Sequence, residues 1–129
     1  MKKTLLLTGL SLLLFSFVIQ SDVDEIIKAF KTANAEQVSS HFEMLIDVTL
    51  PGKETIKNMG KNQAGIALKT FFDENAVKGF DVLSQRDLGS SMYIAGKMAG
   101  KNKSYNVTLW LNSKEGKHVI SAVRINTTQ

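Results

Sequence analysis

The sequence contains no cysteine, which excludes a disulfide framework, thiol chemistry and any metal site with thiolate ligands. Only two histidines are present, His41 and His118. No HxxxH motif, carboxylate cluster, serine–histidine–aspartate spacing or phosphate-binding glycine loop accompanies them. A lone histidine is more often a surface or helix-end residue than a catalytic group. We therefore predict no metal site and no cofactor.

A strong charge of one sign is also lacking. The chain has 16 basic and 12 acidic residues, a net charge of +4, and without Lys2 and Lys3 the balance is 14 − 12 = +2. A domain that is so weakly basic gives little reason to expect binding to nucleic acid or to an anionic membrane. We therefore predict that the protein does not bind nucleic acid.

The longest mostly apolar run stands near the start of the chain and is short for a membrane span. It covers the 15 residues 5–19, directly after two lysines and a threonine. A signal-peptide core needs about 7–15 apolar residues, whereas a spanning helix needs roughly 20. We predict a signal peptide over residues 1–21, with export to the periplasm or the extracellular space. The alternative is an uncleaved leader in a membrane, because the cleavage site at residues 19–21 is weak.

The remaining residues, 22–129, suffice for one domain and are too few for two. A domain of this size buries roughly two-thirds of its unfolded surface. It can therefore fold without disulfides.

Two stretches at the start of this domain have helical spacing. Asp22 and Glu25 have the spacing of a capping box, which predicts that a helix begins at Asp22. Apolar residues then recur at near-helical intervals as far as Ala33. Asn34 is well suited to cap a second, short helix over residues 35–42.

The only proline of the chain ends the first predicted strand, residues 44–51. Three apolar residues of this strand, Ile46, Val48 and Leu50, alternate with Leu45, Asp47 and Thr49. This period of two indicates one buried face, so Asp47 should point away from the apolar set, toward solvent or a partner. Residues 52–60 are polar and are expected to form a connection.

A third helix is predicted over residues 62–75, where Gly65 costs about 1 kcal/mol relative to alanine and is expected to mark a close contact. Beyond residue 79 the period changes to two, and short Gly/Lys/Asn loops separate the apolar runs. The four strands predicted there cover 80–87, 91–99, 104–112 and 118–126. The predicted fold class is α+β: helix, helix, strand, helix and a four-strand antiparallel meander.

This order resembles the nuclear-transport-factor-2-like, ketosteroid-isomerase-like superfamily with its cone-shaped (cystatin-like) fold. The stretch IIKAFKTANAEQVSSHF running into IDVTLPGKE carries the resemblance, and NQAGIALKTFF is similar to the third helix of the superfamily. The resemblance covers nearly all of residues 22–129, and it is closest to small exported bacterial proteins of a domain-of-unknown-function family. It implies a curved mixed sheet wrapped on the helices, with a hydrophobic pocket in the cone.

The resemblance also implies where an enzyme would carry its general base. In ketosteroid isomerases this base is an aspartate directly before a proline, and here Leu50 precedes Pro51. The first helix offers Phe30 where the isomerase has a tyrosine, and the strands 104–112 and 118–126 contain no acid. We therefore predict no catalytic residue. The alternative is an isomerase-type or dehydratase-type enzyme with a non-standard pocket, for which the candidates are Tyr93, Tyr105, Asp81 and His41.

A binding module is the function that this reasoning favours, with a small apolar or amphipathic ligand in the cone. Six large side chains are expected near the mouth of the cone: Phe30, Phe42, Phe72, Met92, Tyr93 and Tyr105. The alternative is that these residues are plain core, because aromatic stripes are more often core than ligand site.

A homodimer is the second prediction, through the sheet face that points away from the helices. Alternation assigns four residues of the last two strands to this face: Trp110, Ile120, Ala122 and Arg124. Tryptophan and arginine are enriched in interfaces, and members of the superfamily commonly dimerise through this face. The alternative is a single exposed tryptophan that lies on neighbouring side chains.

Overall fold

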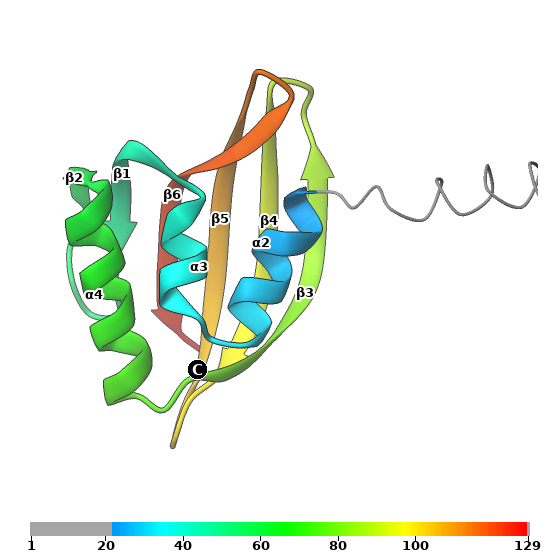
Figure 1. Cartoon of the computed structure of the whole chain (residues 1–129). Coiled ribbons are helices and arrows are strands. Elements are labelled where there is room, and N and C mark those ends of the chain that lie inside the picture. The colour runs from blue at the N-terminus through cyan, green and yellow to red at the C-terminus, as the bar shows by residue number, and fades with distance from the viewer. Residues whose placement is uncertain (1–21, 129) are drawn as a thin grey trace, which may run out of the picture.

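Three helices lie against one face of a six-stranded sheet in the computed structural model of the chain, which describes residues 22–128 (Figure 1). The elements follow the order α2 (Asp22–Lys31), α3 (Ala35–Ser40), β1 (Phe42–Thr49), β2 (Ile56–Gly60), α4 (Lys61–Glu74), β3 (Lys78–Asp87), β4 (Ser91–Ala99), β5 (Ser104–Lys114) and β6 (Lys117–Thr127). The predicted α+β class, the three helices and the four-strand meander are confirmed. The predicted signal peptide, residues 1–21, lies outside the described residues.

The first helix begins at Asp22, as predicted, and the Asp22 side chain contacts His118. Acidic side chains stand in the first turn of α2 and lysines in its last turn, which complements the helix dipole. The chain then turns at Ala33, whose φ is +50°. The Asn34 side chain accepts a 3.1 Å hydrogen bond from the backbone N–H of Gln37, so the predicted cap of the short helix α3 is confirmed.

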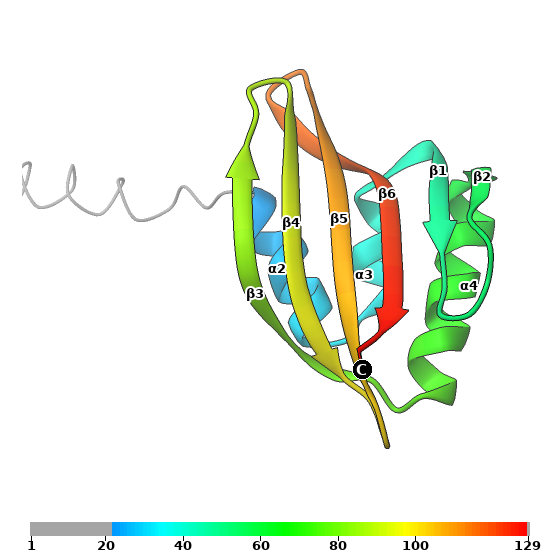
Figure 2. The same ribbon diagram turned by 180° about the vertical axis from the view of Figure 1, so that it is seen from behind.

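The strands follow the order β2-β1-β6-β5-β4-β3 across the sheet. All neighbours are antiparallel except β1 and β6, which run parallel. The helix α4 packs on β1 and β2 at one end of the sheet, whereas α2 packs on β3 at the other. Figure 2 shows the opposite face of the sheet, which none of the described helices covers.

The prediction that residues 52–60 form only a connection is wrong, because Ile56–Gly60 forms the edge strand β2. Most of its side chains are exposed, and a bulge opposite Asp47 contains Asn58 at a φ of +56°. The strand is held by backbone hydrogen bonds to β1. A strand without a buried face leaves no alternation in the sequence by which it could be found.

The apolar core fills the space between the helices and the sheet. The Phe30 ring at its centre lies 5.4 Å from the ring of Phe80 and 6.3 Å from that of Phe72. Inward-facing aliphatic residues of the sheet and helices surround these rings: Ile26, Ile46, Leu68, Ile94, Leu109 and Ile125. Side chains therefore fill this part of the cone.

The assignment of Ile120 to the outer face is wrong. Leu111 pairs with Ile120, but the preceding residue Trp110 pairs with Ala122, so Ser121 is an extra residue in β6. Because of this bulge, the β6 side chains on its N-terminal side point to the opposite face of the sheet from the one that regular alternation predicts. Ile120 is 0 % exposed and belongs to the core, so it is not part of an outer-face surface. None of the helices in residues 22–128 combines the length and the apolar character that crossing a membrane requires.

Candidate functional site

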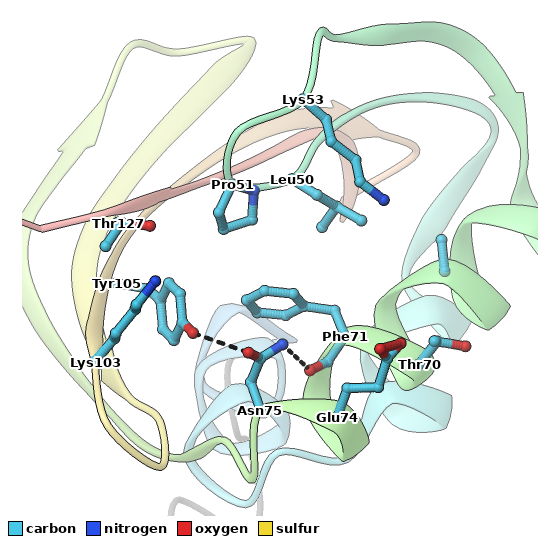
Figure 3. Close-up of a pocket in the computed structure, with 11 residues that line it drawn as sticks. Leu50, Pro51, Lys53, Thr70, Phe71, Glu74, Asn75, Lys103, Tyr105 and Thr127 are labelled. Atoms are coloured by element: carbon cyan, nitrogen blue, oxygen red, sulfur yellow. Dashed lines mark hydrogen bonds between the residues drawn. The ribbon is translucent and has the colours of Figure 1, made fainter.

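A cleft of about 460 Å³ opens at the edge of the core, where the segment after β1, the C-terminal half of α4 and the start of β5 meet (Figure 3). The residues that line it are Leu50, Pro51, Lys53, Ala67, Thr70, Phe71, Glu74, Asn75, Lys103, Tyr105 and Thr127. They come from four separate segments of the chain. The fold alone brings them together.

The wall of the cleft is apolar and rigidly packed. The rings of Phe71 and Tyr105 meet edge to face with their centroids 5.1 Å apart. Both residues are buried, with 8 % and 4 % of their surface exposed. Leu50 and Pro51 face them from the other side of the cleft in Figure 3. Hydrocarbon placed between these side chains would lose its contact with water on both sides.

Asn75, which follows the end of α4, connects this helix to the start of β5 and to the turn before β5. Its side-chain oxygen accepts a 3.1 Å hydrogen bond from the Tyr105 hydroxyl, and its amide nitrogen donates to the Phe71 carbonyl at 2.8 Å. Its backbone carbonyl accepts from the N–H of Lys101 at 2.8 Å. A side chain at Gly100 would lie 2.7 Å from the Tyr105 ring, which explains the glycine. These contacts fix the shape of the cleft.

Charged side chains form the rim. Lys53 and Lys103 lie on opposite sides of the cleft, and Glu74 lies near its mouth on α4 (Figure 3). All three are exposed, and none of them forms an ion pair with another residue of 22–128. With two lysines and one glutamate, the rim carries a formal charge of +2 − 1 = +1.

Leu50 lines this cleft, so the position at which the resemblance places a general base is part of the site. A leucine side chain cannot take a proton. The carboxylate of the cleft is that of Glu74, which is exposed to solvent, and the Tyr105 hydroxyl is bound to Asn75. The arrangement suits the binding of an amphipathic molecule: an apolar wall meets a polar, positively charged rim.

The structure places one of the six predicted pocket residues, Tyr105, in the cleft. Phe30, Phe42, Phe72 and Met92 are buried in the core and do not line it. These four residues were predicted as pocket residues because they are large and apolar, and in the fold they belong to the same core cluster. Tyr93 instead points to the outer face of the sheet, where its ring lies 4.8 Å from that of Trp110. These five residues therefore do not line this cleft, and a ligand-binding role for them stays a prediction.

Sequence reasoning missed most of the cleft because its residues stand in loops and at the ends of elements. Lys53 and Lys103 follow tight turns, and Thr127 ends β6. Periodicity describes only the residues within an element. The available signal was Leu50 with Pro51, which the superfamily resemblance singled out at the end of a strand.

A second cleft of about 520 Å³ lies between the start of α2, the end of α3 and the β5–β6 turn, and it contains both histidines of the chain. The carboxylate of Asp22 accepts a hydrogen bond from the backbone N–H of His118, and the His118 ring Nδ1 lies 3.0 Å from it. His41 and Glu25 line the same cleft. The Asp22–His118 pair joins the first turn of α2 to β6.

The environment of Asp22 lowers its pKa. Burial raises the pKa of this carboxyl, but the hydrogen bonds and charge of His118, together with a backbone hydrogen bond from Val23, outweigh burial. The net effect stabilises the ionised carboxylate in the fold.

The four residues named as candidates for an enzyme lie in four different places. Tyr105 is in the first cleft and His41 in the second, while Tyr93 lies on the outer sheet face and Asp81 is exposed on β3. The fold does not bring them together. Within residues 22–128 no group of three histidine, aspartate or glutamate side chains could hold a metal ion.

A row of five residues crosses the outer face of the sheet. Directly opposite residues of neighbouring strands point to the same face, and the strand register gives the row Arg86, Tyr93, Trp110, Ala122 and Asp47. Trp110 is 43 % exposed at its centre. As predicted, Asp47 points away from Ile46 and Val48. Its carboxylate accepts a 2.9 Å hydrogen bond from the N–H of Asn58, which stabilises the bulge of β2.

Helices on one face of a curved, unclosed and mostly antiparallel sheet define a protein of nuclear-transport-factor-2-like fold. Residues 23–126 match the family described as "Domain of unknown function (DUF4783)", so the chain belongs to that family. The superfamily resemblance of the sequence is thereby confirmed.

Solved structures of the same family share this fold. A family member from Bacteroides ovatus is 26% identical with a TM-score of 0.76, over 81% of this chain and 94% of that chain. One from Bacteroides uniformis is 24% identical with a TM-score of 0.76, over 82% and 96%. A nuclear-transport-factor-2-like protein of unknown function from Cytophaga hutchinsonii is 12% identical with a TM-score of 0.57, over 82% and 86%. Among curated proteins no relative matches the sequence.

Proposed function

We propose that this protein is an exported, non-catalytic binding module that holds a small amphipathic ligand in the cleft between Leu50, Phe71 and Tyr105. The single observation that carries the proposal is the composition of that cleft: a buried aromatic wall beneath an exposed, charged rim. Its volume of about 460 Å³ falls within the range of roughly 300–1,000 Å³ that is usual for small-molecule sites.

The absence of catalysis in this proposal rests on Leu50. A general acid or base must reach the reacting atom and exchange a proton with it. Leu50 cannot do so, the Tyr105 hydroxyl already donates to Asn75, and Glu74 is exposed at the rim. These side chains support binding better than proton transfer.

The proposal can be tested by native mass spectrometry. The full chain is expressed in cells and purified under conditions that keep bound small molecules. We expect a non-covalent adduct that is lost in the variant Ala67→Trp, because Ala67 lines the cleft and the larger side chain fills it. The control Ala95→Trp makes the same change on a strand that does not line the cleft. If no small amphipathic molecule copurifies with the protein or binds to it when added, the proposal is wrong.

Export follows from the predicted signal peptide. The intact mass of the accumulated protein should correspond to a chain that begins at Ser21 or Asp22. In cell fractionation, the protein should be found outside the cytoplasm. A mass that retains residues 1–21 would favour a leader that anchors the chain in a membrane.

Homodimerisation is a second candidate function, supported by the row across the outer face. The row carries Arg86 at one end, Asp47 at the other and Trp110 between them. A two-fold axis through Trp110 would bring Arg86 of one copy toward Asp47 of the other. It would also set the large Tyr93 against the small Ala122. A surface that is complementary to itself in charge and in size suits an isologous contact.

A further inference from the structure

We infer that the ligand of the first cleft is a monoanion with an apolar tail, such as a carboxylate amphiphile, and that Lys53 and Lys103 bind its head group. This inference rests on the proposed function and adds the chemical class of the ligand. Figure 3 shows the two lysines on opposite sides of the cleft, with the ring of Phe71 between them. A molecule with its tail on the Phe71 ring would have one of these lysine side chains on each side of it.

The charges of the rim favour an anion. The ion pairs within residues 22–128 involve other basic residues, namely Lys69, Lys114 and His118. Lys53 and Lys103 are therefore not neutralised by a carboxylate of the described chain. An anionic group in the cleft would meet two such charges, and desolvation by an apolar tail would strengthen the attraction.

Glu74 limits the charge of that anion. Its carboxylate lies at the mouth of the same cleft, where a dianion such as a phosphate monoester would be repelled more strongly than a carboxylate. The rim has a formal charge of +1, which one negative charge balances. Charge complementarity thus favours a single negative charge.

Both lysines stand on backbone that the fold already holds in place. The N–H of Lys53 donates to the Leu50 carbonyl at 3.1 Å, and the N–H of Gly100 donates to the Lys103 carbonyl at 2.7 Å. Hydrogen bonds within these two turns fix where each side chain begins. Only the flexible lysine stems have to be ordered when an anion binds, which reduces the entropic cost of binding.

The inference is tested by three probes with the same tail and different heads: decanoate, decanol and decyltrimethylammonium. We expect decanoate to bind about fivefold more tightly than decanol, and decyltrimethylammonium to bind most weakly, as measured by calorimetry at low salt. The double variant Lys53→Gln/Lys103→Gln should bind decanoate and decanol equally well. The control Lys31→Gln/Lys97→Gln removes the same net charge at exposed positions away from the cleft and should keep the preference.

Two results would overturn the inference in different ways. If decanol binds as tightly as decanoate and Ala67→Trp abolishes the binding of both, the cleft holds a ligand but the lysines do not select an anion. In that case the inference fails and the proposed function stands. If none of the three probes binds, or if Ala67→Trp leaves their binding unchanged, the proposed function fails as well.

Discussion

Asp22 and His118 lie 96 positions apart in the sequence, and the carboxylate of Asp22 accepts a 2.5 Å hydrogen bond from the backbone N–H of His118. The ring Nδ1 of His118 lies 3.0 Å from the other carboxylate oxygen. The pair ties the beginning of α2 to the beginning of β6. It therefore connects the first helix of the domain to the last strand of its sheet.

Stability should fall at acid pH because of this pair. The contacts with His118 hold the pKa of Asp22 below its ordinary value of 3.8, despite the opposing effect of burial. A group whose pKa is lower in the folded state contributes stability that is complete above the unfolded pKa and is lost as the pH falls through the folded pKa. We expect Asp22→Asn to lower the free energy of unfolding at pH 7 by about 1 kcal/mol. The same substitution should also reduce the fall in the free energy of unfolding below about pH 4.

Urea denaturation between pH 2 and 7 measures this effect. Glu25→Gln is the matched control, since Glu25 lines the same cleft and has no ion pair within the described part of the chain. Equal pH profiles for Asp22→Asn and the unaltered protein would contradict the account.

Asn75 should contribute to stability through its contact with Tyr105. The variant Asn75→Ala leaves the hydroxyl of Tyr105 without its partner at a position that is 4 % exposed. We expect a loss of about 1–3 kcal/mol in the free energy of unfolding. The double variant Asn75→Ala/Tyr105→Phe should lose less than the sum of the two single variants, because the two side chains share one hydrogen bond. Strict additivity in urea denaturation would show that the bond contributes nothing.

Gly65 marks a close contact between α3 and α4, as the sequence predicted. A Cβ atom at this position would lie 2.9 Å from the Cβ of Ser39. Helix propensity alone predicts that Gly65→Ala stabilises the protein by about 1 kcal/mol. We expect the opposite sign, a loss of about 1 kcal/mol in thermal or urea denaturation, because the helices must move apart. The second-site change Ser39→Gly should remove the penalty, and a stabilising Gly65→Ala would show that the contact yields without cost.

The outer-face row predicts how a dimer would respond to substitution. In analytical ultracentrifugation, Trp110→Ala should weaken self-association about tenfold or more, as expected for a tryptophan at the centre of an interface. Arg86→Glu should also weaken it, whereas Arg86→Lys should not. A protein that stays monomeric at high micromolar concentration, with or without Trp110, would remove the dimer from the account.

Strand periodicity revealed most of the fold but could not reveal β2 or the face of Ile120. The strands β4 to β6 each have a buried side along which apolar residues alternate, and β3 buries Phe80, whereas β2 has no buried residue. Alternation also assumes regular pairing, and the extra residue Ser121 moves Ile120 into the core. Both departures depend on backbone pairing between strands, which a single strand's sequence does not contain.

The candidate site was harder to predict than the fold. The aromatic residues proposed for a pocket are apolar and evenly spaced, and the same properties make them core residues. Leu50 was identified only because a resemblance marked its position beside Pro51. Lys53 and Lys103 could not be connected, because they stand in different loops and meet around the cleft only after folding.

We propose that the cleft at Leu50, Phe71 and Tyr105 binds an amphipathic ligand. Amide chemical shifts measured by NMR during a titration with decanoate test it most directly. We expect saturable shifts that are largest for residues 50–53, 71–75 and 103–105, and small shifts around Trp110 and around His118. Shifts centred on Trp110 or His118, or no saturable shift at all, would contradict it.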